Sequence, residues 1–231
     1  MTGVLVAGSS GGIGGAVIDE LARRGIPTLG VDRDTFDVTL PGGAEAAVAH
    51  ATEILGGVTG VVHAIGMSGR RLGDGPVTEC TDEAWAEVHR VNHESVFRLL
   101  RAAIPVLGST GGGAVTVVGS ALAHTLDDDF LTVAYASAKG ALVPLVRSSA
   151  FVGRRFGVRV NLVSPGVVDT PMARRAVESP EVSEQLRHLQ PVSGGAQAAD
   201  SVAKVVCWTL SDEALDLSGA VIPADGGWTL R

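Results

Sequence analysis

The sequence is poor in cysteine and in long apolar runs, and each shortage excludes a class of protein. Its two cysteines, Cys80 and Cys207, lie far apart and outside any metal-ligand spacing, so we expect free thiols in a reducing compartment and no metal site. No apolar run approaches the ~18 residues that a membrane span needs. Strand-like sequence begins at Gly3, which leaves no room for a signal peptide. These features predict a soluble cytoplasmic protein.

The sequence also lacks an excess of positive charge. Lysine and arginine total 18 against 25 aspartate and glutamate residues, which gives a net charge of -7. The phosphates of nucleic acids or anionic lipids would repel such a protein, so neither is an expected partner. Hydrophobic residues make up 45% and charged residues 19%, which predicts a packed globule. The length suits one sizeable core, and residues 1–231 are predicted to form a single domain.

Short apolar runs alternate with longer segments of helical periodicity. The runs lack polar alternation, as expected for the strands of a parallel sheet that helices cover on both faces. Repeated strand–helix–strand order predicts an α/β fold with a doubly wound, mostly parallel sheet. Residues 171–196 interrupt the pattern with an irregular stretch, which we interpret as a substrate lid. The predicted strands cover residues 4–7, 28–31, 60–64, 114–118, 158–163 and 220–223, and the predicted helices cover 13–24, 44–55, 82–107, 135–156 and 198–210.

A glycine-rich loop, AGSSGGIG over residues 7–14, joins the first strand to the first helix. Glycines let the backbone turn sharply and approach a pyrophosphate, while the helix N-terminus presents free N–H groups and the positive end of its dipole. This strand–loop–helix context is what the dinucleotide site of a Rossmann fold requires. The loop is therefore predicted to bind a cofactor through Gly8, Ser10, Gly12, Ile13 and Gly14.

The second strand ends at an acidic residue, Asp32, eighteen residues after Gly14. A carboxylate there accepts hydrogen bonds from both ribose hydroxyls of adenosine and repels a 2′-phosphate, which favours NAD over NADP. The neighbouring Arg33 argues the other way, since an arginine can pair with that phosphate. Asp32 weighs more heavily, because the glycine loop offers no basic residue as a second phosphate contact. Asp37 and Val38 are candidates to flank the adenine, although Asp37 suits a plain loop position equally well.

Tyr135 and Lys139 stand four residues apart at the start of a predicted helix, so their side chains share one face. A lysine ammonium beside a phenol stabilises the phenolate and lowers its pKa from about 10. A tyrosine tuned in this way can donate or accept a proton near neutral pH. Tyr135 is the only tyrosine in the chain. Together with the glycine loop, the pair predicts acid–base chemistry beside a dinucleotide.

In combination these motifs resemble the short-chain dehydrogenase/reductase family in its compact single-domain form. The resemblance runs from Gly3 to Trp228, nearly the whole chain. Several separate motifs in the family's order are far more specific than any one of them. The family's TGxxxGIG loop corresponds to residues 7–14 with Ala7 in place of threonine, its YxxxK motif to Tyr135 and Lys139, its catalytic serine to Ser120, its helix asparagine to Asn92, its PG motif to Pro165 and Gly166, and its late DGG to residues 225–227.

The resemblance implies an oxidoreductase that transfers a hydride between NAD(H) and a secondary alcohol or ketone. Ser120 would then donate a hydrogen bond to the substrate oxygen, and Tyr135 would act as the general acid/base. Lys139 would bond the nicotinamide ribose and keep the phenol acidic, while Asn92 would hold a water that relays the proton. Two of these four catalytic candidates also have structural explanations: Ser120 suits a turn at a strand end, and Asn92 suits a hydrogen bond within its helix.

The same resemblance places further residues around the cofactor. Thr170 and the backbone of Val168 would bind the carboxamide, although Thr170 also suits a cap before a helix that starts with proline. The family's NNAG motif reads HAIG at residues 63–66, so we interpret His63 as a structural substitute and expect altered packing there. Residues 32–37 are too few for the helix that usually follows the family's second strand. The cofactor residues implied in this part of the chain are Ala64, Gly66, Tyr135, Lys139, Pro165, Gly166, Val168 and Thr170.

The sequence gives less information about the substrate pocket than about the cofactor site or the catalytic residues. Leu122, Met172 and the 171–196 lid are predicted to line it. His124 is a candidate substrate contact, but it suits a surface loop as well. Four arginines could meet an anionic substrate, although such side chains are more commonly solvated: Arg70, Arg71, Arg174 and Arg175.

Two other functions stay open at this point. One is an NADPH-dependent reductase of ketoacyl or polyketide-type substrates, and the other is a non-catalytic nucleotide-sensing protein on the same fold. A family resemblance also implies assembly, since members are commonly tetramers. Apolar residues beyond one face of the helices at 82–107 and 135–156, and an apolar tail around Trp228 and Leu230, lead us to expect a homotetramer.

Overall fold

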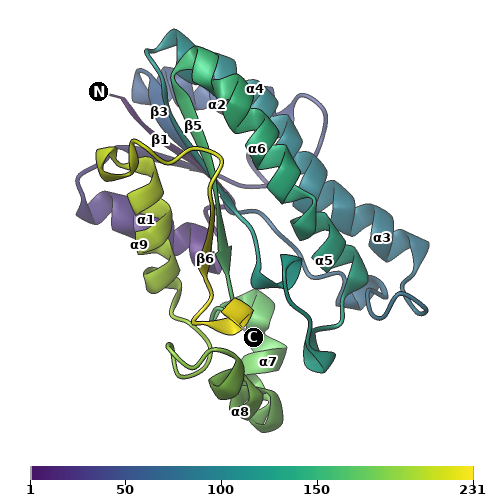
Figure 1. Ribbon diagram of the computed structural model, residues 1–231. Helices are drawn as coiled ribbons and strands as arrows, with labels where there is room; N and C mark the ends of the chain where they lie inside the picture. Colours follow the sequence, from purple (N-terminus) through teal and green to yellow (C-terminus); the bar gives the residue numbers. More distant parts are fainter. Residues whose placement is uncertain (1, 231) are drawn as a thin grey trace.

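The structure is a computed structural model that describes residues 2–230. In these residues six strands form one sheet: β1 Gly3–Ala7, β2 Thr28–Val31, β3 Val58–His63, β4 Gly113–Val118, β5 Val158–Pro165 and β6 Val221–Ala224. Their order is β2-β1-β3-β4-β5-β6, and every neighbouring pair is parallel (Figure 1). The predicted doubly wound α/β fold is confirmed.

Helices cover both faces of this sheet: α1 Gly12–Arg23, α2 Gly43–Leu55, α3 Asp82–His89, α4 Ser95–Ser109, α5 Val133–Gly140, α6 Leu142–Gly153, α7 Arg174–Glu178, α8 Pro180–Leu189 and α9 Ala199–Leu210. The helices α2, α4 and α6 share one aliphatic core with the sheet, and α1 and α9 share a second core on its other face (Figure 1). Neighbouring residues of β1 supply opposite cores, Leu5 the first and Val6 the second. Burial on both faces explains why the strands read as unbroken apolar runs.

The strand order reverses between β1 and β3, and this position determines where a ligand can lie. The chain leaves β1 toward β2 on one side, and β3 leads to β4 on the other. The loops that follow the carboxyl ends of β1 and β3 therefore diverge and leave a crevice between them. Residues 32–42 after β2 form turns and the chain then enters α2, so the expectation that the family's usual helix between the second and third strands has no room is wrong.

Two long helices expected from the sequence are interrupted in the structure. The predicted helix at 82–107 is α3 and α4 joined by a π-helical turn, Arg90–Glu94. Within this turn the side-chain amide of Asn92 donates to the carbonyl of Val88 at 3.0 Å, so it competes with the backbone for that acceptor. The predicted helix at 135–156 begins earlier, at Val133, and consists of α5 and α6, which meet at Ala141.

The segment 171–196 was predicted to be irregular, and this is wrong for most of its length. It contains a short turn, Pro171–Ala173, followed by α7 and α8. The hydroxyl of Ser179 accepts from the amide of Val182, and Pro180 occupies the first turn of α8, which is a common start for a helix. Apolar residues of α7 and α8, among them Ala176 and Leu186, pack on Trp228 in a core of their own.

Within residues 2–230, no helix is both long and apolar enough to cross a membrane. The same residues contain no group of three or more His, Cys, Asp or Glu side chains that could hold a metal ion. Cys80 is a half-buried free thiol and Cys207 a buried one.

Candidate active site

Two cavities meet at the carboxyl ends of the strands and form one groove. The larger, about 820 Å³, contains three of the four predicted catalytic side chains, and the smaller, about 460 Å³, contains Asp32. Four consecutive residues, 64–67, line both cavities, so the groove is continuous from the end of β2 to the start of α5. A dinucleotide is an extended ligand with two chemically different ends, and a groove of this form suits it.

The glycine loop is packed too tightly for side chains at two of its positions. A Cβ atom on Gly14 would lie 1.9 Å from the carbonyl oxygen of Gly8, and one on Gly12 would lie 2.3 Å from Cγ2 of Thr170. Gly8 itself has a φ of +90°, which side-chain-bearing residues rarely adopt. The loop therefore brings bare backbone and the N-terminus of α1 to the groove, as a pyrophosphate site requires.

The carboxylate of Asp32 is held by the glycine loop. Its Oδ2 atom accepts from the hydroxyl of Ser9 at 2.5 Å and from the amide of Ser10 at 2.8 Å. Oδ1 of Asp32 accepts no hydrogen bond among the described residues, and Asp32 lines the smaller cavity. Asp37 and Val38 line the same cavity, and Asp37 Oδ1 also accepts from the amide and hydroxyl of Thr39. Burial alone would raise the pKa of Asp37, but the bonds from Thr39 outweigh it and the pKa lies below its ordinary value.

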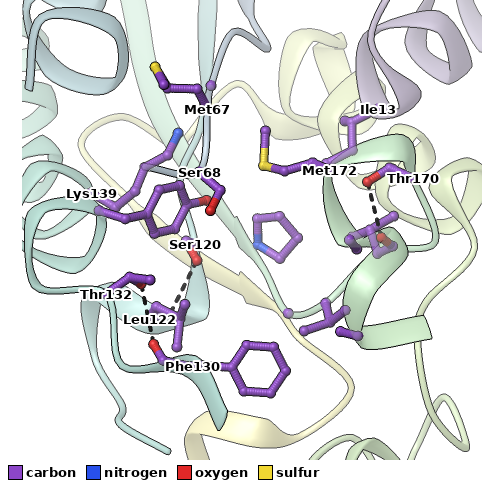
Figure 2. Close-up of a pocket in the computed structure, with 18 of the residues that line it drawn as sticks. Ile13, Met67, Ser68, Ser120, Leu122, Phe130, Thr132, Lys139, Thr170 and Met172 are labelled. Atoms are coloured by element: carbon purple, nitrogen blue, oxygen red, sulfur yellow. Dashed lines mark hydrogen bonds between the residues drawn. The ribbon is translucent and has the colours of Figure 1, made fainter. Parts of the chain in front are cut away.

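Three of the four side chains predicted to carry the chemistry, Ser120, Tyr135 and Lys139, converge in the larger cavity. Ser120 follows the end of β4, Tyr135 is the third residue of α5, and both side chains line this cavity. Lys139 lies one turn later on the same helix, and its ammonium is 5.9 Å from the centre of the Tyr135 ring. That ammonium donates to the carbonyl of Val118 at 2.9 Å, which fixes its position at the end of β4. In Figure 2, Lys139 and Ser120 lie on one side of the cavity and Thr170 on the other.

The expected lowering of the Tyr135 pKa is not what the structure shows. Burial of the phenol raises its pKa above the ordinary value, and the hydrogen bond with Ser120 opposes this only in part. Lys139 does not reverse the shift, since its ammonium lies over the ring and bonds a carbonyl. Burial in turn lowers the pKa of Lys139 to about 8. At neutral pH the site thus holds a protonated phenol beside a charged ammonium.

Asn92 fixes the part of the groove that both cavities share. Its Oδ1 accepts from the amide of Met67 at 3.1 Å, and its Nδ2 donates to the carbonyl of Met67 at 3.0 Å. A Cβ atom on Gly66 would lie 3.0 Å from Asn92 Oδ1 and 3.6 Å from Lys139 Nζ, so these three groups are neighbours. Asn92 is fully buried, and it combines the predicted bond within its helix with a direct hold on the loop after β3.

The PG segment lines the side of the cavity opposite α5. Pro165, Gly166, Val168 and Thr170 all border it, and the hydroxyl of Thr170 donates to the carbonyl of Val168 instead of capping the next turn. Two buried glutamines, which the sequence analysis missed, hold this segment through its backbone. Gln197 Oε1 accepts from the amide of Gly166, and Gln190 bonds both the amide and the carbonyl of Val167.

His63 is structural, as its position suggested. It is buried at the end of β3, and its Nε2 lies 2.8 Å from the hydroxyl of Ser95. Its Nδ1 has no hydrogen-bond partner among the described residues. Burial, together with the nearby charge of Lys139, lowers the pKa of His63 to about 3, so the ring is neutral at physiological pH.

The predicted substrate residues divide between the cavity and the surface. Leu122 and Met172 line the larger cavity, whereas His124 is exposed and does not line it, because the turn after Ser120 directs it outward. The tail prediction was partly wrong: Trp228 is 2% exposed and packs edge-to-face on Phe130 at 5.2 Å. Both rings line the cavity, and neither was identified from the sequence as a pocket residue.

A buried carboxylate at the start of the catalytic helix was also missed. Asp74 Oδ1 accepts from the amide of Ala134 at 2.9 Å, and its Oδ2 accepts from the amide of Tyr135 at 3.0 Å. The residue at the N-cap position, Thr132, makes no side-chain cap. Asp74 therefore caps α5 from a loop about sixty residues earlier in the chain, and it fixes the backbone that carries the phenol.

Comparison with known proteins gives a consistent result over the whole chain. A family model described as Enoyl-(Acyl carrier protein) reductase matches residues 8–229. The chain is 30% identical to 2-(S)-hydroxypropyl-CoM dehydrogenase 3 of Xanthobacter autotrophicus, over 98% of this chain and 96% of that protein. It is 28% identical to galactitol 2-dehydrogenase (L-tagatose-forming) of Cereibacter sphaeroides, over 97% and 94% of the two chains.

A solved structure shows the same agreement in three dimensions. A short-chain type dehydrogenase/reductase from Mycobacterium ulcerans has a TM-score of 0.87 and 27% identity, and the match covers 100% of this chain and 90% of that one. Sequence motifs, sheet order and full-length similarity therefore agree. This chain belongs to the short-chain dehydrogenase/reductase family of oxidoreductases, which act on alcohol or carbonyl substrates with a nicotinamide cofactor.

Proposed function

We propose that the protein is an NAD(H)-dependent enzyme that interconverts a secondary alcohol and a ketone, with Tyr135 as the general acid/base. The observation that carries this proposal is the convergence of Ser120, Tyr135 and Lys139 in a cavity continuous with an acid-lined cleft. A non-catalytic nucleotide sensor has no need for this set of side chains. An NADPH-dependent reductase is disfavoured because the smaller cavity carries Asp32, Asp34 and Asp37 where a 2′-phosphate would lie.

In the proposed reaction the protein positions the substrate oxygen and moves one proton. Ser120 and Tyr135 hold the oxygen from two sides through their hydroxyl groups. During reduction the phenol of Tyr135 gives its proton to that oxygen, and during oxidation the proton of the alcohol passes to Tyr135. The nicotinamide, when bound, supplies or accepts the hydride. Lys139 adds a fixed positive charge beside the ring, and Asn92 keeps the loop at Met67 in place.

The raised pKa of Tyr135 bears on the direction in which the enzyme works best at neutral pH. A phenol that stays protonated is ready to donate, which is the role that carbonyl reduction requires. Oxidation needs the phenolate, so it is expected to gain with rising pH. We therefore expect reduction to be the faster direction at pH 7.

The experiment that tests the proposal is a cofactor and substrate panel. The purified protein is mixed with NADH or NADPH and a series of ketones, and with NAD or NADP and the corresponding secondary alcohols, while the absorbance of the reduced nicotinamide is followed. The proposal expects turnover with at least one pair and a preference for NAD(H). Cofactor binding by calorimetry without any turnover would favour the nucleotide-sensing alternative.

Assembly remains a proposal, and surface side chains support it. Large apolar residues on α3, α4 and α6 are 45–61% exposed: Trp85, Phe97, Phe151 and Val152. In Figure 1 these helices lie along one side of the molecule. We infer a homotetramer that buries this side, in a cytoplasmic protein with reduced cysteines. Light scattering at micromolar concentration tests the assembly, and a monomer mass would contradict it.

A further inference from the structure

Two arginines from distant parts of the chain converge on one backbone oxygen at the edge of the larger cavity. Arg70, after β3, and Arg175, in α7, each donate from Nη2 to the carbonyl of Asp129, at 2.8 Å and 2.9 Å. Arg175 also lies over the ring of Phe130, 6.0 Å from its centre. A guanidinium has five N–H donors, and among the described residues each of these two side chains has only this one hydrogen bond. Most of their donor capacity is therefore unused.

The charges of this pair are not balanced by contact with a carboxylate. Among residues 2–230, no carboxylate oxygen lies within 4.0 Å of either guanidinium, whereas seven other arginines have such partners: Arg23, Arg24, Arg90, Arg98, Arg101, Arg174 and Arg187. The charges of two carboxylates, Asp74 and Asp129, act on Arg70 without contacting its guanidinium. The carboxylate of Asp74 accepts from the first amides of α5, and Asp129 offers the pair only its backbone oxygen. Burial lowers the pKa of Arg70, and the charge of Arg175 lowers it further.

Two like charges held together at a cavity favour the entry of an anion. Both residues are exposed at the rim of the cavity, and an oxoanion bound between them would relieve the repulsion between their charges. The planar fork of arginine fits two oxygens of a carboxylate or phosphate, which a backbone carbonyl matches poorly. Arg71 and Arg174 line the same cavity, and Glu178 is the only acid that does so among the described residues.

We propose that Arg70 and Arg175 bind an oxoanion at the end of the substrate remote from its reacting carbonyl, so that the natural substrate is a keto acid or a phosphorylated ketone. This inference rests on the proposed function for the position of the reacting group, at Ser120 and Tyr135. Apolar side chains line the same cavity, among them Leu122, Phe130 and Trp228, and Arg175 lies over the ring of Phe130. Figure 2 shows Phe130 and Leu122 on the same side of the cavity as Ser120. The substrate class is therefore a ketone with a short apolar body and an anionic tail.

Matched pairs of ketones that differ only in charge test this proposal. Acetoacetate is compared with acetoacetamide, levulinate with levulinamide, and dihydroxyacetone phosphate with dihydroxyacetone, each with NADH. The first two pairs report on a carboxylate at two chain lengths, and the third reports on a phosphate. The wild-type protein is expected to reduce the charged member of at least one pair with a kcat/KM about tenfold higher or more, the size of one charge-assisted contact.

Three variants assign such a preference to the arginine pair. Arg70→Gln and Arg175→Gln each remove one charge and keep a hydrogen-bonding side chain. In each variant the kcat/KM values for the two members of the preferred pair should differ by no more than about threefold, because roughly one charge-assisted contact is lost. Their kcat/KM for the neutral member should stay near wild type. Arg187→Gln is the matched control, since Arg187 lies on α8 of the same lid, is paired with Glu184 and does not line the cavity.

Other outcomes overturn the proposal without touching the oxidoreductase assignment. Equal or better reduction of the neutral member in every pair would do so, and so would a charge preference that survives both substitutions. An equal loss for both members would show that the two arginines only tie the lid to Asp129.

A binding measurement decides the case in which no ketone is reduced at all. Calorimetry with glutarate and with inorganic phosphate needs no redox step. Binding that Arg70→Gln and Arg175→Gln weaken at least tenfold, and that Arg187→Gln leaves intact, would support the anion site while the proposed reaction failed. If neither anion binds, or if all three variants bind the anion equally well, the proposed anion site is wrong.

Discussion

The two ends of the groove carry opposite charge, although one groove joins them. The smaller cavity has an excess of acids, with Asp32, Asp34, Asp37 and Glu87 against Arg33 and Arg90. The larger cavity has an excess of bases, with Arg70, Arg71, Lys139, Arg174 and Arg175 against Glu178. A protein of net charge -7 thus contains a locally positive site. The net charge of a protein indicates how it interacts with large charged partners such as nucleic acids. It does not predict the electrostatic potential inside a cavity.

The charged groups at the two ends also differ in how they are held. At the acidic end, Asp32 accepts hydrogen bonds from the glycine loop and Asp37 accepts from Thr39 of its own loop, and these bonds fix both carboxylates in place. At the basic end, Arg70 and Arg175 share one carbonyl. The carboxylates of the acidic end are therefore held by hydrogen bonds within the protein. The two guanidinium groups of the basic end keep N–H donors that bond no protein group among residues 2–230. Substitutions that change one end alone can test this difference.

The largest effect is expected from a substitution that affects only the basic end. Tyr135→Phe keeps the ring and removes the hydroxyl, so turnover should fall by about 10²–10⁴-fold or more, the contribution of general acid–base catalysis. NAD affinity, which depends on the acidic end, should stay within a few-fold. Steady-state kinetics on the best substrate of the panel and calorimetry with NAD provide the two measurements. Turnover near the wild-type rate would mean that another group transfers the proton.

A smaller effect is expected where the two ends meet, at His63 beside residues 64–67. Its folded pKa of about 3 lies below the 6.5 of a free histidine, so below pH 6.5 the unfolded chain takes up a proton that the folded protein excludes. Stability is therefore lost as pH falls from 6.5 toward 3. At pH 5 the loss is about 2 kcal/mol, from about 1.4 kcal/mol per pH unit.

The substitution His63→Asn should remove this part of the pH dependence. Urea denaturation at pH 7 and pH 5 compares the slopes of wild type and variant, and His124→Asn, at an exposed site, serves as the control. A wild-type slope in His63→Asn would show that protonation of other groups is responsible.

A substitution at the acidic end should change the ratio of NAD affinity to NADP affinity by about tenfold. Asp32→Asn keeps an oxygen for Ser9 and Ser10 but removes the charge that repels a 2′-phosphate. Wild type is expected to bind NAD at least tenfold more tightly than NADP, about 1.4 kcal/mol, and the variant should bind both almost equally. Asp34→Asn, at an exposed position of the same cavity, should shift the ratio less. Equal affinities in the wild type would make Arg33 the deciding residue.

The smallest effect is expected from making the basic end still more positive. Asp74→Asn removes a carboxylate near Arg70 and weakens the cap of α5, which should cost about 1 kcal/mol of unfolding free energy. Because the cap holds the backbone of Tyr135, kcat should fall a few-fold while NAD affinity stays unchanged. Asp82→Asn, an exposed carboxylate in the first turn of α3, is the control. Unchanged stability in Asp74→Asn would mean that water replaces the cap.

The features predicted correctly from the sequence are local patterns. The strands appear as buried apolar runs, and the glycine loop, Ser120 and Tyr135 lie at the element ends where the sequence placed them, whereas their roles in catalysis and cofactor binding stay predictions. The π-helical turn was not predicted, and within it Asn92 bonds Met67, which lies 25 residues earlier in the loop after β3. The cap by Asp74, the pair of Arg70 and Arg175, and the burial of Trp228 were also missed. Each of these features joins segments far apart in the chain, and the hydrophobic periodicity of a sequence carries no information about such contacts.

The position of Trp228 gives the protein an optical probe of its own cavity. Of the three tryptophans, Trp85 is 45% exposed and Trp208 is half-buried, whereas Trp228 is 2% exposed and lines the cavity beneath the lid. An indole in such apolar surroundings fluoresces at shorter wavelength than one in water. Its emission changes when its neighbours move, and it overlaps the absorption of reduced nicotinamide. Ligand entry and lid movement can therefore be followed by fluorescence without any added label.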